Sequence, residues 1–296
     1  MKPFRELNVE KEEALVYITG IAYDLGASLG KGAKDAPKVI WDQTIALPPY
    51  TMDGKSILDT KLYDNGIHNV TKQFEIYELS KVIDLDVFNI FIGGDHSIAI
   101  NLEKRFYEKQ KRLGKTPVII HIDAHPDFCD FYDGSYESHA CPCKRSFDLG
   151  YKDFTLIGIR GYEGQEVEFF EKHPEIKIYN SSYILENGIE QMLYEIINKY
   201  NKDEYAIYLS YDVDVNDPFA VSGTGTPEAF GLTPYTTLKI ITTLLKKLNI
   251  QAMDIVETSP ALDDNNKTSC WLVTKTLYEI FRILIEKRWI KWNTLH

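Results

Sequence analysis

Short apolar runs alternate along the chain with longer stretches that have the spacing of amphipathic helices, and this alternation limits the folds open to it. The apolar runs, rich in β-branched and aromatic residues as buried strands are, cover Leu15–Thr19, Val87–Ile92, Val118–Ile122, Phe154–Ile159, Tyr205–Leu209 and Gln251–Val256. The helical stretches cover Ile98–Arg112, Gly164–Lys172, Ile189–Lys199, Pro234–Leu248 and Ser269–Glu286. Such alternation favours a mainly parallel sheet with right-handed crossovers and helices on both faces. The sequence therefore predicts a three-layer α/β/α fold.

Composition narrows the class of protein. The chain has 296 residues, of which 44% are hydrophobic, and no linker or repeat divides it, so we expect a single domain over residues 1–296. A formal net charge of −11 disfavours nucleic acid or an anionic membrane as a partner and suits a neutral or cationic small molecule. Charges are scattered through MKPFRELNVEKEE where a signal peptide would be apolar, and no segment approaches the ~20 apolar residues of a membrane span. We therefore expect a cytoplasmic protein.

The four cysteines, Cys129, Cys141, Cys143 and Cys270, lack the paired two-residue spacing of a zinc knuckle or ribbon. Reduced thiols are the expectation. Cys141 and Cys143 follow His139 closely, so a role beside a site or in redox sensing stays open.

The segment Gly93-Gly94-Asp95-His96-Ser97 follows the apolar run FNIFI. Two glycines let the chain turn off a strand, which would place His96 at the mouth of the sheet. Taken alone, a histidine in this position is more often a hydrogen-bonded structural residue. Asp95 can be explained as a helix cap or as an acceptor behind the site.

Two further clusters follow predicted strands. Asp123, His125 and Asp127 occupy alternate positions after VIIHI, and Asp212 and Asp214 alternate after YAIYL. On an extended segment alternate side chains share one face, and unpaired carboxylates crowded there would be costly to desolvate. A metal ion removes that cost. Because the carboxyl ends of parallel strands meet at one edge of a sheet, we expect these clusters to converge.

Six ligands are too many for one ion, so the sequence predicts two divalent cations. The ligand set is His96, Asp123, His125, Asp127, Asp212 and Asp214. Oxygen-rich ligands with some imidazole suit Mn²⁺, and a pair of ions can lower the pKa of a water toward neutrality. His121 lies within the strand and is interpreted as a packed or hydrogen-bonded core histidine. Glu257, at the end of QAMDIV, is unremarkable by itself.

The motifs GGDHS, DAHPD and SYDVDVNDP, followed by SGTGTPEAFGLT and VETSP, together resemble the ureohydrolases, the family of arginase and agmatinase. The resemblance runs from about Gly20, in GIAYDLGASLGKGAKDAP, to the last helix. It implies a three-layer α/β fold and two manganese ions. By motif, His96 and Asp127 would bind one ion, His125 and Asp214 the other, and Asp123 and Asp212 would bridge them. It also implies a homo-oligomer, a trimer or hexamer.

The same resemblance assigns roles that spacing cannot. His139, in SHACP, matches the histidine thought to pass a proton to the leaving amine, and Glu257 matches the carboxylate that pairs with the guanidinium. Thr226, in GTGTPE, falls on the substrate-side loop. Asp127 would help to hold the developing tetrahedral intermediate as urea and an amine are formed.

Agmatine, hydrolysed to putrescine and urea in polyamine biosynthesis, is the expected substrate. SGTGTPEAFGLT resembles the agmatinase pattern more than the formimidoylglutamase pattern, and the loop Phe128–Ser138 lacks the Asn- and Ser-rich pattern of arginases. Ala36 in KDAP and Ala140 in SHACP stand where glycine is common in the agmatinase pattern. Guanidinobutyrase, formimidoylglutamase and arginase activities remain alternatives, as does a non-enzymatic metal-dependent binding protein. A two-metal phosphoesterase would need cations for its phosphate, and Lys144, Arg145 and Arg160 are the candidates near the motifs.

Overall fold

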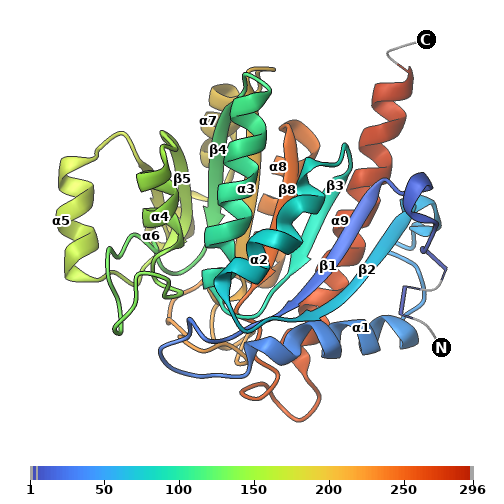
Figure 1. The fold of residues 1–296 in the computed structure, drawn as a ribbon, viewed down its shortest axis with the longest axis horizontal. Helices are drawn as coiled ribbons and strands as arrows, with labels where there is room; N and C mark the ends of the chain where they lie inside the picture. Colours follow the sequence, from blue (N-terminus) through green and yellow to red (C-terminus); the bar gives the residue numbers. More distant parts are fainter. Residues whose placement is uncertain (1–2, 5, 294–296) are drawn as a thin grey trace.

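A computed structural model describes residues 3–4 and 6–293, and its centre is an eight-stranded sheet in which every pair of neighbouring strands is parallel (Figure 1). The strand order is β2-β1-β3-β8-β7-β4-β5-β6. The strands are β1 Val16–Ala22, β2 Leu62–Asn69, β3 Phe88–Ile92, β4 Thr116–Ile122, β5 Asp153–Ile159, β6 Lys177–Asn180, β7 Tyr205–Asp212 and β8 Ile250–Val256. The predicted parallel sheet is confirmed.

Helices cover both faces of this sheet, which gives the predicted three layers (Figure 1). One face packs against α1 Ala36–Ala46, α6 Ser181–Asn187, α7 Glu190–Tyr200, α8 Pro234–Lys247 and α9 Thr268–Asn293. The other packs against α2 Gln73–Leu79, α3 Ala99–Arg112, α4 Pro142–Leu149 and α5 Gly164–Lys172. None of the helices among the described residues is both long and apolar enough to cross a membrane.

The six predicted strands are the six inner strands of the sheet, and the two that the apolar runs did not indicate are its edges. Inner strands are buried on both faces, so Ile18, Ile90 and Ile120 have no exposed surface. The edge strand β2 reads LYDNGIHN and is mostly half-buried, and β6 has only four residues. An edge strand needs no continuous apolar run, which is why these two were missed.

Four neighbouring inner strands, β3, β8, β7 and β4, end at the same edge of the sheet. The segments that leave them begin at Gly93, Glu257, Val213 and Asp123. The fold therefore brings the predicted motifs to one edge, as expected for parallel strands. The loops after β1 and β5 flank the same edge.

Candidate metal centre and active site

His96 is placed by a tight turn after β3. A Cβ atom on Gly94 would lie 1.5 Å from the carbonyl oxygen of Tyr23, so only glycine fits where the two segments pass each other. Asp95 then caps the 3-10 helix His96–Ile98 by accepting a hydrogen bond from the backbone N–H of Ser97 at 2.9 Å. The turn and the cap together direct the buried His96 side chain toward the ends of β4 and β7.

The two aspartate motifs share a local backbone conformation, which is a turn and not the extended strand that the sequence predicted. Neither motif is an extended strand: β4 ends at Ile122, Asp127 has φ 57°, and Asp214 lies in the 3-10 helix Val213–Val215. The first aspartate of each motif accepts a hydrogen bond from the backbone N–H two residues later, Asp123 from His125 at 2.6 Å and Asp212 from Asp214 at 2.8 Å. The interpretation from strand alternation was therefore wrong in its geometry, because only Asp212 lies within a strand and turns beyond the strand ends direct the other ligands of these motifs.

The turns bring one imidazole nitrogen against three carboxylates. His96 Nδ1 lies near one oxygen of each, at 3.0 Å from Asp123 Oδ2, 3.0 Å from Asp127 Oδ2 and 3.2 Å from Asp212 Oδ2. A second group lies beside it, where His125 Nδ1 is 3.0 Å from Asp214 Oδ2 and 3.5 Å from Asp123 Oδ1. Asp123 thus reaches both groups, one oxygen to each.

These atoms pass a test for metal ligands. Among the residues that the structure describes, His96 Nδ1, Asp123 Oδ2, Asp127 Oδ2 and Asp214 Oδ2 are buried side-chain atoms without a hydrogen-bond partner. Burial and the charges of Asp214 and Asp123 raise the pKa of Asp212 well above its usual value. Buried polar atoms left unpaired among like charges are costly, and cations placed between them would remove that cost. Two groups of side chains that could each hold an ion share Asp123: one is His96, His121, Asp123 and Asp127, and the other is Asp123, His125 and Asp214. These donors therefore fit divalent ions at two neighbouring positions.

His139 and Glu257 form a separate pair beside the ligands. His139 Nδ1 lies 3.3 Å from Glu257 Oε1, which also accepts a hydrogen bond from the backbone N–H of His96 at 2.8 Å. Burial acts to lower the pKa of His139, but the hydrogen bond and the charge of Glu257 outweigh it and raise that pKa to about 9. Glu257 has φ 62°, a strained backbone conformation for a residue other than glycine. Its backbone N–H donates a hydrogen bond to the carbonyl oxygen of Gly94, which helps to hold the residue in this conformation.

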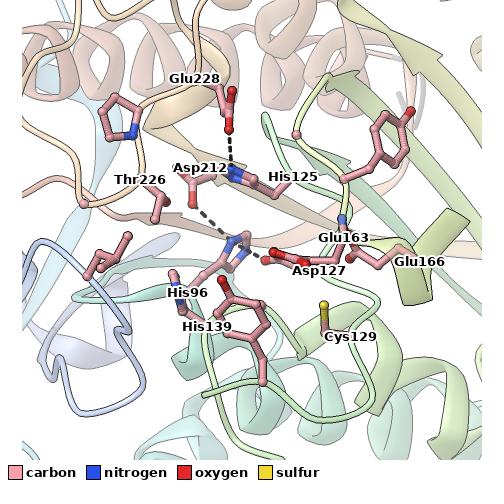
Figure 2. A pocket seen from close by; sticks show the side chains of 17 residues that line it. His96, His125, Asp127, Cys129, His139, Glu163, Glu166, Asp212, Thr226 and Glu228 are labelled. Atoms are coloured by element: carbon pink, nitrogen blue, oxygen red, sulfur yellow. Dashed lines mark hydrogen bonds and ion pairs between the residues drawn. The ribbon is translucent and has the colours of Figure 1, made fainter.

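A pocket of about 310 Å³ opens over the ligands (Figure 2). Six of the predicted site residues line it, namely His96, His125, Asp127, His139, Asp212 and Thr226. Cys129 lines it as well, whereas the other three cysteines are buried away from its lining, and all four are free thiols. Burial raises the pKa of Cys141 to about 12, so this thiol stays protonated.

The profile of the arginase family matches residues 14–282. The chain belongs to the arginase family.

An agmatinase of Bacillus cereus is 29% identical over 278 residues, which cover 90% of this chain and 91% of that protein. A guanidinobutyrase of Pseudomonas aeruginosa is 26% identical over 279 residues, covering 90% and 85%. The crystal structure of an agmatine ureohydrolase of Thermoplasma volcanium superposes with a TM-score of 0.85 at 28% identity, covering 98% of this chain and 96% of that one. The chain is thus a ureohydrolase, a hydrolase that acts on guanidino compounds.

The cations near the motifs are occupied elsewhere, which argues against a phosphate substrate for this arginase-family member. Lys144 and Arg145 pair with Asp130 and Asp148. Arg160 donates hydrogen bonds to backbone carbonyls, including those of residues 214–216 and 228. None of the described residues that line the pocket is a lysine or an arginine.

Several residues that support the site were not singled out in the sequence. His96 Nε2 lies 2.8 Å from Ser210 Oγ, which donates to Asp254 Oδ1 at 2.7 Å, and Tyr208 donates to Asp254 Oδ2 at 2.8 Å. Tyr208 and Ser210 share a face of β7 with Asp212, so period-two alternation could have found them. Asp254, a carboxylate within the apolar run of β8, was a second available signal.

His121 lies where the sequence placed it. It is fully buried, stacks on His96 with ring centroids 4.9 Å apart, and its Nε2 contacts the carbonyl oxygen of His125 at 3.1 Å. The same nitrogen lies 3.0 Å from Asp123 Oδ2. His121 therefore contacts the turn that carries His125, as a hydrogen-bonded core histidine would, and it also belongs to a group with His96, Asp123 and Asp127 that could hold a metal ion.

Proposed function

We propose that this ureohydrolase hydrolyses agmatine to putrescine and urea, using two divalent ions, in the first place Mn²⁺, within one catalytic domain of residues 1–296. One observation supports this most strongly: buried ligand atoms without hydrogen-bond partners converge beside an imidazole–carboxylate pair, at a pocket whose described lining contains no lysine or arginine. A guanidino substrate fits such a pocket because it is cationic and its carbon is the atom to be attacked.

The proposed ligands divide into two sets around shared carboxylates. His96 and Asp127 would hold one ion, and His125 and Asp214 the other, with Asp123 and Asp212 between them. The two oxygens of Asp123 lie toward His96 and His125 respectively, which suits a bridging role. Bound divalent ions supply Lewis-acid polarisation and lower the pKa of water, which favours hydrolysis near neutral pH.

The proposed catalytic residues bind the guanidinium group and supply the proton that the departing amine needs. Glu257 would pair with the guanidinium. Its carboxylate lies close to the pocket wall at Gly225, because a Cβ atom on that glycine would be only 3.7 Å from Glu257 Oε2. His139, protonated under the influence of Glu257, would give a proton to the departing amine. Asp127 would hold the tetrahedral intermediate, and Thr226 would contact the substrate from its loop on the pocket wall.

The far end of the pocket favours a substrate with a distal cation. Glu163 and Glu228 line its mouth, while Glu166 accepts hydrogen bonds from the backbone N–H groups of Phe128 at 2.7 Å and Glu163 at 2.9 Å (Figure 2). A distal ammonium would be attracted by the carboxylates of Glu163 and Glu228, whereas the carboxylate of guanidinobutyrate or formimidoylglutamate would be repelled, and arginine carries both charges at that end. This charge pattern is the argument for agmatine.

A substrate panel tests the proposal. Manganese-loaded protein is offered agmatine, guanidinobutyrate, arginine and formimidoylglutamate, and urea or formamide release is measured. We expect the highest kcat/KM with agmatine and equimolar putrescine as the second product. A higher value with guanidinobutyrate would overturn agmatine alone, while no product from any compound would overturn the hydrolytic function in favour of a metal-dependent binding protein.

Three further features are proposed with this function. The protein would form a homo-oligomer, a trimer or hexamer, as light scattering can check. It would act in the cytoplasm and supply putrescine to polyamine biosynthesis. Metal analysis of protein purified without added salts would identify the native ion among manganese, nickel, cobalt and zinc.

A further inference from the structure

The loop after β1 forms one wall of the pocket and is fixed to the His96 turn. Asp95 Oδ2 accepts hydrogen bonds from the backbone N–H groups of Gly26 at 2.8 Å and Ala27 at 3.1 Å, and the Asp95 N–H donates to the carbonyl of Tyr23 at 3.0 Å. Asp95 is fully buried, so these bonds are shielded from water. Asp95 therefore does more than cap a helix: it holds the loop in place.

The same loop contacts His139 twice. The backbone N–H of His139 donates to the carbonyl of Gly26 at 3.0 Å, and His139 Nε2 lies 2.8 Å from Ser28 Oγ. Because Glu257 faces the other ring nitrogen, both nitrogens of His139 are engaged, one by a carboxylate and one by a hydroxyl. The imidazole ring is thus held from two sides.

Close packing restricts the loop beyond Ser28. A Cβ atom on Gly30 would lie 2.5 Å from the Cα of Gly225, so the two backbones are in direct contact. The N–H of Gly32 donates to the buried Asp24 Oδ2 at 3.1 Å. With both ends fixed, the Ser28 hydroxyl has a defined position relative to His139.

We propose that Ser28 is a positioning residue for hydrolysis, acting through the contact of its Oγ with His139 Nε2. Protonated His139 donates from Nε2 to Ser28 Oγ, and its Nδ1 faces Glu257, the carboxylate proposed to pair with the guanidinium. The proton given to the departing amine would therefore leave from Nδ1, while Nε2 keeps its proton and its hydrogen bond to the Ser28 hydroxyl. Ser28 thereby holds the ring orientation through the proton transfer, and this role rests on the proposed function of His139.

A double-mutant cycle tests the inference. Wild type, Ser28→Ala, His139→Gln and the double variant are loaded with Mn²⁺ and assayed on the best substrate of the guanidino panel. We expect Ser28→Ala to lower kcat roughly tenfold with KM within about twofold, as for residues that orient a functional group. In the His139→Gln background the same substitution should change kcat by less than about twofold, because residues that act as one unit are not additive.

Rescue and control variants separate positioning from a structural effect. Ser28→Thr keeps the hydroxyl and should restore most of the lost kcat. Ser182→Ala, on an exposed part of α6, should leave kcat unchanged. Metal content and thermal unfolding should match wild type in Ser28→Ala, since Ser28 is only partly buried and its side-chain hydrogen bond is to His139, which is not a proposed ligand.

Three outcomes would overturn the inference. One is an unchanged kcat in Ser28→Ala, and another is an equal loss in both backgrounds, which would place the effect of Ser28 outside His139. A rise in KM alone would make Ser28 a substrate contact instead. An active wild type distinguishes all of these from failure of the proposed function, in which no guanidino compound releases urea and both proposals fall together.

Discussion

The ligand cluster and the mouth of the same pocket are built by different parts of the fold. The proposed ligands follow directly from β3, β4 and β7, and His96, Asp123 and Asp214 are each 1% exposed. The mouth is built by loops, where Leu29 is 66% exposed and the Glu228 side chain 43%. Strand ends fix the first region by packing, whereas the second has room to change without disturbing the sheet.

We infer from this difference that the ligand cluster determines the reaction and that the mouth of the pocket determines which substrate is preferred. In the cluster each side chain contacts another ligand, so one substitution leaves buried partners unpaired. At the mouth a substitution changes the charge met by the distal end of the substrate and little else. We therefore expect cluster variants to lose activity outright and mouth variants to alter KM and preference.

The largest effect is expected from Asp123→Asn. The change removes a charge that faces both ligand groups, so metal binding and turnover should fall together. The loss of kcat should exceed the roughly 10²–10⁴-fold that a general acid contributes, because the ions and the water they activate are both lost. Metal content per subunit and urea release measured on one preparation check this. Full activity with normal metal content in Asp123→Asn or Asp212→Asn would refute the ligand assignment.

The next largest effect is expected from His139→Gln, which tests whether this buried histidine acts as a proton donor and not as part of the metal site. We expect kcat to fall by about 10²-fold, as when a general acid is removed, with metal content unchanged. The contrast with Asp123→Asn is the informative result. Parallel loss of metal would make His139 part of the ligand support rather than a proton donor.

A smaller effect is expected in the pH dependence. Activity that needs protonated His139 is present below its pKa and is lost as pH rises through that value, which Glu257 raises to about 9 against the effect of burial. Glu257→Gln removes the charge, so the alkaline limb of kcat should move to lower pH. Profiles of kcat at saturating metal measure the shift. If the limb stays where it is in wild type, a group other than His139 sets it.

Most of the fold could be predicted from the sequence, because buried strands and helices produce regular patterns of apolar residues. The inner strands are apolar on both faces, and α5 and α8 were predicted to within a residue of their observed bounds. The edge strand β2 carries Asp64, Asn65 and His68, so hydrophobicity alone could not reveal it. Pairing with β1, a property of the folded chain, makes it a strand.

The residues of the site could be predicted from the sequence, but the backbone conformation that brings them together could not. Alternation predicted that Asp123 and Asp127 share a face, and the structure brings both to His96, through a left-handed residue at 127 that spacing does not reveal. Ser28 and Asp95 were harder to assign. They are 67 residues apart in sequence, and their importance comes from the loop that links them to His139. Long-range contacts of this kind leave no periodic signal in one sequence.

The smallest expected effect belongs to the mouth, where Glu228→Gln tests the charge argument for agmatine. Glu228 Oε1 lies 3.8 Å from His125 Nε2 and its side chain is partly exposed, so solvent screens its charge. An exposed ion pair contributes about 1 kcal/mol or less, so KM for agmatine should rise by at most about fivefold, with kcat and metal content unchanged. KM for guanidinobutyrate should fall in the same variant, because a repulsive charge is removed. Added salt should narrow both changes, since screening weakens exposed charges first. If Glu228→Gln instead lowers kcat and metal content, Glu228 supports His125, and the boundary between cluster and mouth lies further out than the proposed function places it.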